Sequence, residues 1–337
     1  MKLKTDRKKD LSMIFAALIV ALVYIICVIY IYQSLNVSET DSGESSRRQV
    51  AVIVKSTDSA FWKSVFSGAG AAATEYNLSV TTQGPENEDD YETQNEMIRQ
   101  AVQDGAEAII FSAVDFYANA DTIDEAAAAG VKIIVIDSTV NSEHISCSIS
   151  TDNYKAGQMA AQAILNAAEG SLKLGIVNFD RNSANGQQRE KGLRDVLGTQ
   201  PRVEIMDAIN VKSTTEDAKR GTEKMLERHP EINAIATFND WTSLGVGYAI
   251  RELGIGEETA VVAFDSNVVS VGMLETGEVD ALIVQNPYAI GYLGVEHAYR
   301  LINGLPVAEK DVDTATTIIT KENMYEEESQ KVLFPVD

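Results

Sequence analysis

Short apolar segments alternate with longer amphipathic segments along the chain from residue 49 onward. The apolar segments are rich in Val, Ile and Ala, which is typical of strands that are buried on both faces of a sheet. The predicted strands are 50–55, 79–83, 108–111, 132–136, 147–150, 173–178, 202–208, 234–238, 260–264 and 281–284. The amphipathic segments predict helices over 61–76, 91–104, 118–129, 185–197, 215–228, 242–253, 268–276 and 288–303.

The alternation of strand and helix predicts parallel sheets that helices cover on both faces. It runs to about residue 150 and restarts near residue 173. We therefore predict an α/β protein with two doubly wound parallel-sheet lobes.

One glycine pattern raises the question of a bound dinucleotide. Residues 68–73 read GAGAAA, which fits the G-x-G-x-x-A fingerprint. In a dinucleotide-binding fold these glycines form the turn between strand and helix, next to the pyrophosphate. Here the predicted strand ends near Lys55 and the helix begins near Phe61, so Gly68 and Gly70 lie inside the helix. We interpret them as residues that let the helix pack closely, and we expect no cofactor.

The N-terminal region has a different pattern. Residues 1–10 contain a basic cluster, and residues 11–32 are apolar and carry no charge. A helix over 11–32 is about 33 Å long, which is enough to cross a hydrocarbon core of about 30 Å. The alternative is a cleaved signal peptide, but the apolar run exceeds the usual length and no small-residue cleavage site follows. We predict a signal anchor, with residues 1–10 in the cytoplasm, residues 11–32 in the cell membrane and everything after residue 32 outside. Residues 33–48 are polar and predict a flexible linker.

The charge balance narrows the classes of partner. The chain of 337 residues has 50 acidic and 28 basic residues and a net charge of −22. Such acidity argues against a nucleic acid partner or docking on anionic lipid. The two cysteines, Cys27 and Cys147, are predicted to lie in the membrane and outside it, so they cannot pair with each other.

Motifs for catalysis are scarce. The three histidines lie in unrelated segments and none has a partner at metal-ligand spacing, so we predict no metal site. The G-x-S-x-G and P-loop patterns are absent. Acidic residues are plentiful but no spacing singles out a pair, so an exported carbohydrate-active enzyme is the alternative to a non-catalytic binding protein.

Polar or aromatic residues follow the ends of several predicted strands. In an open parallel sheet, ligands bind at the edge where the strands end. Taken singly, each residue fits a helix cap or a core position, but their recurrence favours a site. Carboxylates accept hydrogen bonds from hydroxyl groups, amides and arginine donate them, and aromatic rings stack on C–H faces, which suits a neutral polyhydroxyl ligand. The residues are Phe61, Trp62, Asp137, Ser138, Arg189, Asn239, Trp241, Asp265 and Gln285.

From about residue 50 to residue 320, the chain resembles the type I periplasmic sugar-binding proteins, the ribose-binding-protein-like group of ABC transport receptors. These share their fold with the ligand domains of lactose-repressor-type regulators. The landmarks are Ala60-Phe61-Trp62, Val135-Ile136-Asp137-Ser138, Ser150-Thr151-Asp152-Asn153-Tyr154-Lys155-Ala156-Gly157, Arg189-Glu190-Lys191-Gly192-Leu193, Phe238-Asn239-Asp240, Ala263-Phe264-Asp265 and Val284-Gln285-Asn286-Pro287.

The resemblance implies which residues contact a sugar and how the sequence departs from the ribose pattern. Ser138 stands where ribose binders have an arginine, and the cleft arginine of the family corresponds either to Gln187 or to Arg189. Trp241 has no equivalent in the ribose pattern and would enlarge the aromatic surface. The implied contact residues are Ser59, Phe61, Trp62, Asp137, Arg189, Asn239, Asp265 and Gln285.

The resemblance also implies discontinuous lobes that close on the ligand by a hinge motion. Three hinge strands would pass near Thr151, Gln285 and Thr317. The implied segments are 50–151 and 286–315 for lobe 1, and 152–285 and 316–337 for lobe 2.

The function implied is that of a membrane-anchored extracytoplasmic solute-binding protein for a sugar-like ligand. Its partner would be an ABC transporter permease or a membrane sensor histidine kinase. About ten cytoplasmic residues are too few for a signalling domain, so any signal must pass through another protein. A transcription factor is disfavoured, because the spanning segment replaces any DNA-binding helix-turn-helix.

Overall fold

The computed structural model describes Ile25 and residues 47–334. The tail at 1–10, the predicted transmembrane helix at 11–32 apart from Ile25, and the linker at 33–48 apart from its last two residues therefore lie outside the described residues. Among the residues that are described, no helix is both long and apolar enough to cross a membrane. The described residues from Arg48 onward belong to one compact unit.

Two six-stranded sheets form the centre of this unit. The strands are β1 (Gln49–Ile53), β2 (Ser79–Gln83), β3 (Ala108–Phe111), β4 (Lys132–Ile136), β5 (Cys147–Ser150), β6 (Leu172–Asn178), β7 (Val203–Asn210), β8 (Ala234–Thr237), β9 (Ala260–Phe264), β10 (Ala281–Val284), β11 (Asp311–Asp313) and β12 (Thr317–Thr320). The first sheet has the order β11-β5-β4-β3-β1-β2 and the second β12-β10-β9-β8-β6-β7. Only the β10–β12 pair is antiparallel in these sheets.

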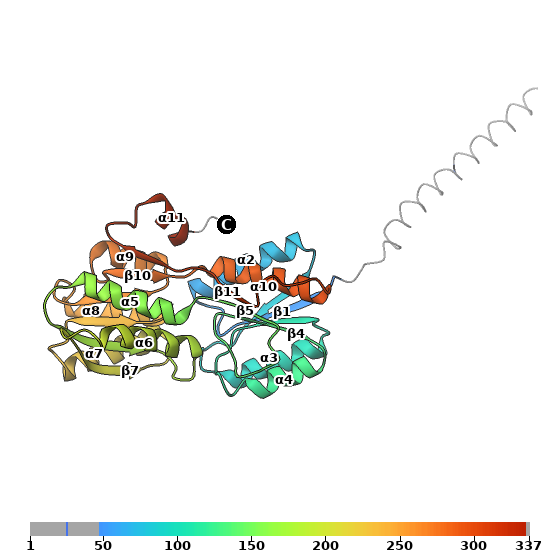
Figure 1. The fold of residues 1–337 in the computed structure, drawn as a ribbon, viewed down its shortest axis with the longest axis horizontal. Coiled ribbons are helices and arrows are strands. Elements are labelled where there is room, and N and C mark those ends of the chain that lie inside the picture. Colours follow the sequence, from blue (N-terminus) through green and yellow to red (C-terminus); the bar gives the residue numbers. More distant parts are fainter. Residues whose placement is uncertain (1–24, 26–46, 335–337) are drawn as a thin grey trace, which may run out of the picture. The chain divides into compact units, whose positions relative to one another are not determined.

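Helices cover both faces of each sheet, as the alternating pattern predicts. They are α2 (Ala60–Glu75), α3 (Tyr91–Gln103), α4 (Ala120–Ala128), α5 (Asn153–Ala167), α6 (Ala184–Leu197), α7 (Thr215–Arg228), α8 (Asp240–Leu253), α9 (Val268–Thr276), α10 (Pro287–Ile302) and α11 (Glu327–Leu333). Helices α2 and α10 pack on one face of the first sheet and α3 and α4 on the other. In the second sheet, α5 and α6 cover one face, and α7, α8 and α9 cover the other. Figure 1 shows these two groups as separate lobes, called here lobe 1 and lobe 2.

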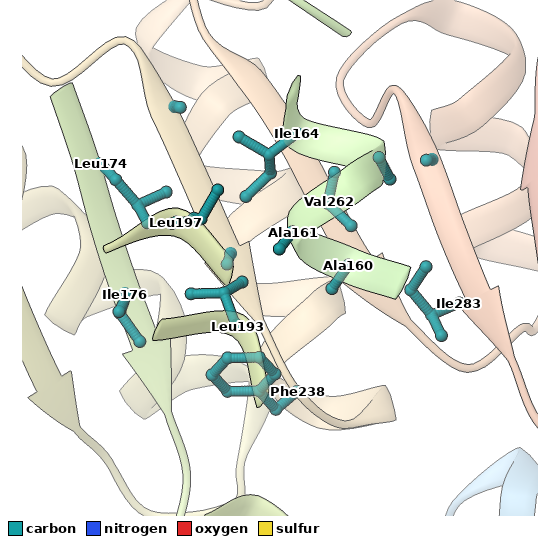
Figure 2. Close-up of a cluster of buried hydrophobic side chains, with 14 of the residues drawn as sticks. Ala160, Ala161, Ile164, Leu174, Ile176, Leu193, Leu197, Phe238, Val262 and Ile283 are labelled. Carbon is teal, nitrogen blue, oxygen red and sulfur yellow. The ribbon is translucent and has the colours of Figure 1, made fainter. Parts of the chain in front are cut away.

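Each sheet separates two hydrophobic clusters, because successive side chains of a strand point to opposite faces. In β1, Val52 packs with α2 and α10, whereas Ile53 packs with α3 and α4. Figure 2 shows the corresponding cluster between the second sheet and its helices α5 and α6, where Ile176, Leu193 and Ala160 lie together. Strands that are apolar on both faces therefore pack against a layer of helices on each side of the sheet.

The chain passes between the lobes three times. It leaves the first sheet after β5 and enters lobe 2 at α5. It returns after β10, because α10 packs on the first sheet. It crosses again between β11, which pairs with β5, and β12, which pairs with β10. Each lobe is thus built from segments that are far apart in the sequence.

From residue 49 onward, each predicted strand and helix is observed, with bounds that agree within two residues. The structure contains four further elements that the sequence did not predict. The largest omission is α5, whose buried face consists mostly of small residues such as Gly157, Ala160 and Ala161. Small residues give a weak periodic signal although they allow close packing. Strands β11 and β12 and helix α11 are short, and β11 has the sequence Asp-Val-Asp, so only its pairing with β5 makes it a strand.

The interpretation of the glycine pattern is confirmed for Gly68. A Cβ atom at this position would lie 2.0 Å from the backbone oxygen of Tyr288 in α10. The contact is reciprocal, because a Cβ at Gly291 would lie 1.9 Å from the backbone oxygen of Val65 in α2. Gly70 has nothing within 4 Å of such an atom. The pattern therefore belongs to a close helix–helix contact, for which only one of the two fingerprint glycines is needed.

Candidate ligand-binding site

Side chains from both lobes line one small cavity. It lies where several strands of the two sheets end, which is the edge at which parallel sheets bind ligands. All of the sequence-predicted site residues line it except Ser138 and Gln187. The lining residues are Lys55, Ser59, Phe61, Trp62, Glu88, Asp137, Phe179, Asn185, Arg189, Asn239, Asp240, Trp241, Asp265 and Gln285.

Gln187 and Ser138 do not line the cavity. Gln187 is exposed, and its amide donates a hydrogen bond to the backbone oxygen of Arg181. Gln187 lies two positions before Arg189 on α6, which places the two side chains about 200° apart around the helix, so only one of them can face the cavity. Ser138 is buried, but its hydroxyl finds no hydrogen-bond partner among the described residues and does not line the cavity.

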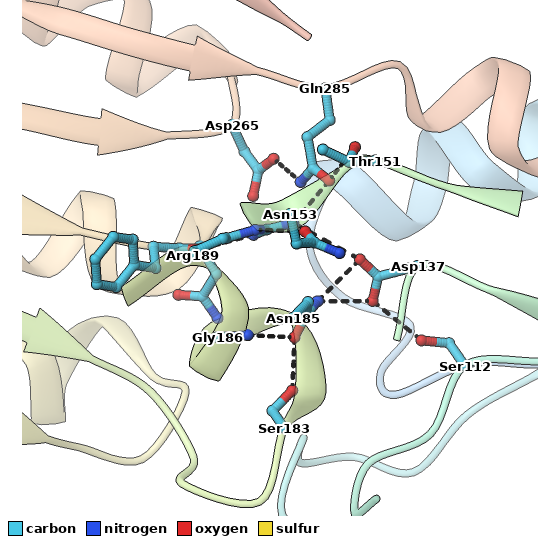
Figure 3. Close-up of polar contacts among 12 residues, drawn as sticks. Ser112, Asp137, Thr151, Asn153, Ser183, Asn185, Gly186, Arg189, Asp265 and Gln285 are labelled. Atoms are coloured by element: carbon cyan, nitrogen blue, oxygen red, sulfur yellow. Dashed lines mark hydrogen bonds and ion pairs between the residues drawn. The ribbon is translucent and has the colours of Figure 1, made fainter. Parts of the chain in front are cut away.

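Arg189 is the centre of a buried hydrogen-bond network (Figure 3). Its Nε donates to Oδ1 of Asn153 at 2.8 Å, and its Nη1 donates to the backbone oxygen of Phe238 at 2.6 Å. Its Nη2 donates to Oε1 of Gln285 at 2.7 Å and lies 4.0 Å from Oδ1 of Asp137. Acceptors on several sides therefore hold the guanidinium in one position between the lobes.

Asp137 and Asp265 directly follow β4 and β9 and have left-handed backbone conformations, with φ of 56° and 65°. This conformation is unfavourable for residues other than glycine, although aspartate tolerates it better than most. Neither residue caps a helix, because β5 follows Asp137 and Asn267 caps α9. The cap alternative therefore fails for both, and the strained turns direct the two carboxylates into the cavity.

Asn239 caps a helix and also lines the cavity. Its side chain caps α8 by accepting a hydrogen bond from the backbone N–H of Thr242 at 3.0 Å. Its Nδ2 donates to Oγ of Ser213 at 2.6 Å and faces Oε2 of Glu88 at 3.4 Å. Capping uses the amide oxygen and leaves the amide nitrogen for the cavity.

The aromatic residues of the cavity come from both lobes. The rings of Phe61 and Trp62 meet edge to face, with centroids 4.8 Å apart. The Trp62 Nε1 donates to Oε1 of Glu88 at 2.8 Å, which fixes the indole. Trp241 from α8 lines the cavity, and the Lys55 ammonium lies 5.1 Å from the centroid of the Phe179 ring.

The sequence reasoning missed five lining residues, although signals for some of them existed. Lys55 and Phe179 follow the ends of β1 and β6, so the same edge rule applied to them. Asn185 precedes Arg189 by four positions on α6 and therefore shares its face. Asp240 is the first residue of α8, where an aspartate also fits the common preference for acidic residues at a helix N-terminus. Glu88 lies in the loop before α3, where no local pattern distinguishes it from the other acidic residues.

Burial perturbs the ionisable groups of the cavity. Burial raises the pKa of Asp265 to about 6, although the nearby Arg189 guanidinium acts in the opposite direction. Burial, followed by the neighbouring Asp265 carboxylate, raises the pKa of Asp240 to about 7. Burial also lowers the pKa of Arg189, which the surrounding carboxylates partly offset. Such perturbed groups converging in one cavity are typical of functional sites.

Polar side chains join the two lobes across the cavity. Asn185 of α6 donates to both carboxylate oxygens of Asp137, at 3.0 and 3.1 Å (Figure 3). Further contacts of this kind include Lys55 Nζ to Ser183 Oγ at 2.9 Å, Ser213 Oγ to Glu88 Oε2 at 2.6 Å, and Lys212 Nζ to Asp89 Oδ2 at 2.9 Å. The cavity is therefore enclosed by both lobes at once.

Comparisons with known proteins agree with this architecture. A family model described as "Periplasmic binding protein domain" matches residues 50–306. The ribose import binding protein RbsB of Bacillus subtilis is 23% identical over 80% of this chain and 86% of its own length. A carbohydrate transporter solute-binding protein from Agrobacterium radiobacter, solved in complex with D-arabinose, has a TM-score of 0.84 and 28% identity, covering 86% of this chain and all of that one. A sugar transporter protein from Clostridium phytofermentans has a TM-score of 0.75 and 31% identity, covering 82% of this chain and all of that one.

Proposed function

This chain belongs to the periplasmic binding protein domain family and is a type I periplasmic sugar-binding protein, and from this premise we propose that its interlobe cavity holds one sugar-like small molecule. The relatives reported above are binding proteins of sugar transport and not enzymes, so the exported carbohydrate-active enzyme is set aside. The ligand class follows from the chemistry of the cavity.

One observation carries the proposal: carboxylates, amides, an arginine and aromatic rings from both lobes line a single cavity. Asp137 and Asp265 accept hydrogen bonds from hydroxyl groups, and Asn239 donates them. Aromatic rings from Phe61 and Trp241 provide apolar surface for the C–H faces of a sugar ring. RbsB is named for ribose and the Agrobacterium protein holds D-arabinose, which supports a monosaccharide-sized ligand.

We further propose that the lobes are hinged units, with 50–151 and 286–315 in one and 152–285 and 316–337 in the other. The three crossings near Thr151, Gln285 and Thr317 would be the hinge. In support, the Thr151 hydroxyl donates to Oε1 of Gln285 at 2.8 Å, and the Gln285 amide donates to Oδ1 of Asp265 at 2.6 Å. Two of the crossings are therefore linked to a side chain of the cavity.

The proposed location is extracytoplasmic, with residues 11–32 as a membrane anchor and 33–48 as a tether. An anchored binding protein stays at the membrane surface, where its partner also lies. Two partners suit this arrangement: an ABC transporter permease, which would import the ligand, and a sensor histidine kinase, which would report it. The names of the relatives favour import.

A ligand screen by thermal unfolding tests the proposal. The full chain in a non-ionic detergent is unfolded with pentoses, hexoses, polyols and nucleosides in turn. A ligand at a hundred times its Kd stabilises the folded state by about 2.7 kcal/mol, which raises Tm by several degrees. Calorimetry should then show saturable binding of the same compound without turnover.

Two neighbouring substitutions locate the binding. Asp137→Ala removes a carboxylate of the cavity and should weaken binding by about a hundredfold, because hydrogen bonds to charged groups contribute about 1.5–3 kcal/mol each. Ser138→Ala is the matched control and should leave the affinity within about twofold, since Ser138 does not line the cavity. Equal effects of the two changes, or no binding by the natural chain, would contradict the proposed site.

A further inference from the structure

The cavity contains more buried negative than positive charge. Its carboxylates are Glu88, Asp137, Asp240 and Asp265, and its cations are Lys55 and Arg189; each of these residues is at most 9% exposed. Removing an uncompensated charge from water is strongly unfavourable, so a buried charge normally has a partner of opposite sign. A neutral sugar supplies no such partner, and two carboxylates would stay uncompensated.

The two cations do not reach all of the carboxylates. Arg189 lies 4.0 Å from Asp137 and also stabilises the charge of Asp265. The Lys55 ammonium donates to Ser183 and has no ion pair with any described residue. Arg189 also interacts with the charge of Glu88, whereas no described cation acts on Asp240.

Glu88 and Asp240 differ in how many donors surround them. Glu88 accepts hydrogen bonds from Trp62, Ser213 and Asn239, which together stabilise its charge. Asp240 accepts two, from Nδ2 of Asn267 and from the backbone N–H of Ala60. Its negative neighbours include Asp265 and Glu88. Asp240 is therefore the carboxylate of the cavity that is least compensated.

Asp240 can be compensated by a proton or by a cation from the ligand. It is the first residue of α8, where the positive end of the helix dipole favours the charged carboxylate. Aromatic side chains of Phe61, Trp62 and Trp241 line the same cavity, and aromatic faces attract ammonium groups. Both features favour an ammonium group over a proton.

We propose that the ligand is a polyhydroxylated molecule that carries one protonated amine, an amino sugar or aminocyclitol, with the amine bound at Asp240. This inference rests on the proposed function, because it assigns the ligand class of the same cavity. The hydroxyl groups of the ligand contact Asp137, Arg189 and Asn239, where the donors and acceptors are balanced. The amine supplies the positive charge that the cavity lacks.

Matched ligands test the amine directly. Calorimetry at pH 7 on the full chain compares amino sugars that carry the amine at carbon 1, 2 or 6 with their neutral parent hexoses and with their N-acetyl derivatives. At least one amino sugar should bind about tenfold or more tightly than its parent, and its N-acetyl form should lose this advantage, because acetylation removes the charge. This comparison uses the natural chain and does not depend on the folding of a variant.

A substitution then assigns the effect to Asp240. Asp240→Asn keeps the size of the side chain and should reduce the advantage of the amine to about twofold or less. Asp121→Asn is the matched control, since Asp121 is an exposed aspartate in the first turn of α4, and it should leave the advantage intact.

The outcomes separate this inference from the proposed function. If neutral hexoses bind as tightly as their amino forms, or if Asp240→Asn leaves the preference unchanged, the amine proposal is overturned and sugar binding stands. Binding of a neutral hexose with proton uptake, seen as a buffer-dependent heat, would also overturn it in favour of a protonated Asp240. If none of these compounds and no member of the neutral screen binds, the proposed function itself fails.

Discussion

Asp240 is subject to opposing influences at the scale of the single residue. The N-terminus of α8 and the amide of Asn267 favour its charged form. Burial and the nearby Asp265 carboxylate oppose that form and raise its pKa to about 7. Because the folded chain holds this proton more tightly than the unfolded chain does, the carboxyl couples folding to pH.

The coupling predicts how stability depends on pH. An aspartate of the unfolded chain loses its proton near pH 4, whereas Asp240 keeps its proton up to about pH 7. The stability that this proton contributes is present below about pH 4 and is lost as the pH rises through 7. Asp240→Asn has no proton to lose, so its free energy of unfolding should rise relative to that of the natural chain by on the order of 3 kcal/mol between pH 4 and pH 8. Urea titrations between pH 5 and pH 8 measure most of this change.

Other carboxyl groups titrate in the same range, so only the difference between chains is informative. Asp121→Asn provides the reference, because Asp121 is exposed and lies outside the cavity. If the free energy of unfolding of Asp240→Asn differed from that of the natural chain by a constant amount at every pH, the folded and unfolded chains would bind this proton equally.

At the scale of the element, the contact between α2 and α10 joins two segments of lobe 1 that are far apart in the sequence. Gly68 and Gly291 let the two backbones approach so closely that no Cβ atom fits between them. Phe61 and Trp62 lie at the start of α2, so the packing of α2 against α10 also positions the aromatic side of the cavity.

Two glycines of the same helix give a matched pair of substitutions. Gly68→Ala places a methyl group against the Tyr288 backbone and should lower the free energy of unfolding by about 2 kcal/mol or more. Gly70→Ala meets nothing within 4 Å and should raise it by up to about 1 kcal/mol, because alanine favours a helix more than glycine does. Urea unfolding distinguishes the two, and destabilisation of similar size would mean that helix propensity and not close packing decides both positions.

At the scale of the whole molecule, an ion pair and several hydrogen bonds join the lobes. The Lys212–Asp89 pair is largely exposed and contributes at most about 1 kcal/mol. The hydrogen bonds include side-chain contacts around the cavity, such as the one between Asn185 and Asp137. Contacts of this kind favour closure only weakly, so a ligand that binds both lobes should shift the balance toward the closed form.

The shift is measurable as a distance between the lobes. Spin labels at Asp121→Cys in lobe 1 and Glu227→Cys in lobe 2, both exposed sites, report the distance by pulsed electron paramagnetic resonance. Adding the compound that gives the largest thermal shift should narrow the distribution toward one short distance. The same labels in a chain that also carries Asp137→Ala should show no change. If the distance distribution of the labelled chain without Asp137→Ala stayed unchanged on adding the compound, the lobes would not move on binding.

The amino-acid sequence alone determined the α/β class, most of the strands and most of the helices. These features depend on local periodicity, and a strand such as β3 is apolar throughout whatever it pairs with. It also indicated most of the cavity, because residues that follow parallel strands share one edge. Asp137 and Asp265 were predicted in this way.

Only the tertiary structure decided which side chains face one another. It selected Arg189 over Gln187, because the direction of a helix face depends on the sheet against which the helix packs. It made a strand of the polar segment β11 through pairing with β5. It also brought Glu88 and Asp240 together from different lobes. The excess of negative charge in the cavity arises because charged residues from distant segments of the chain lie together there. No local pattern in the sequence predicts it.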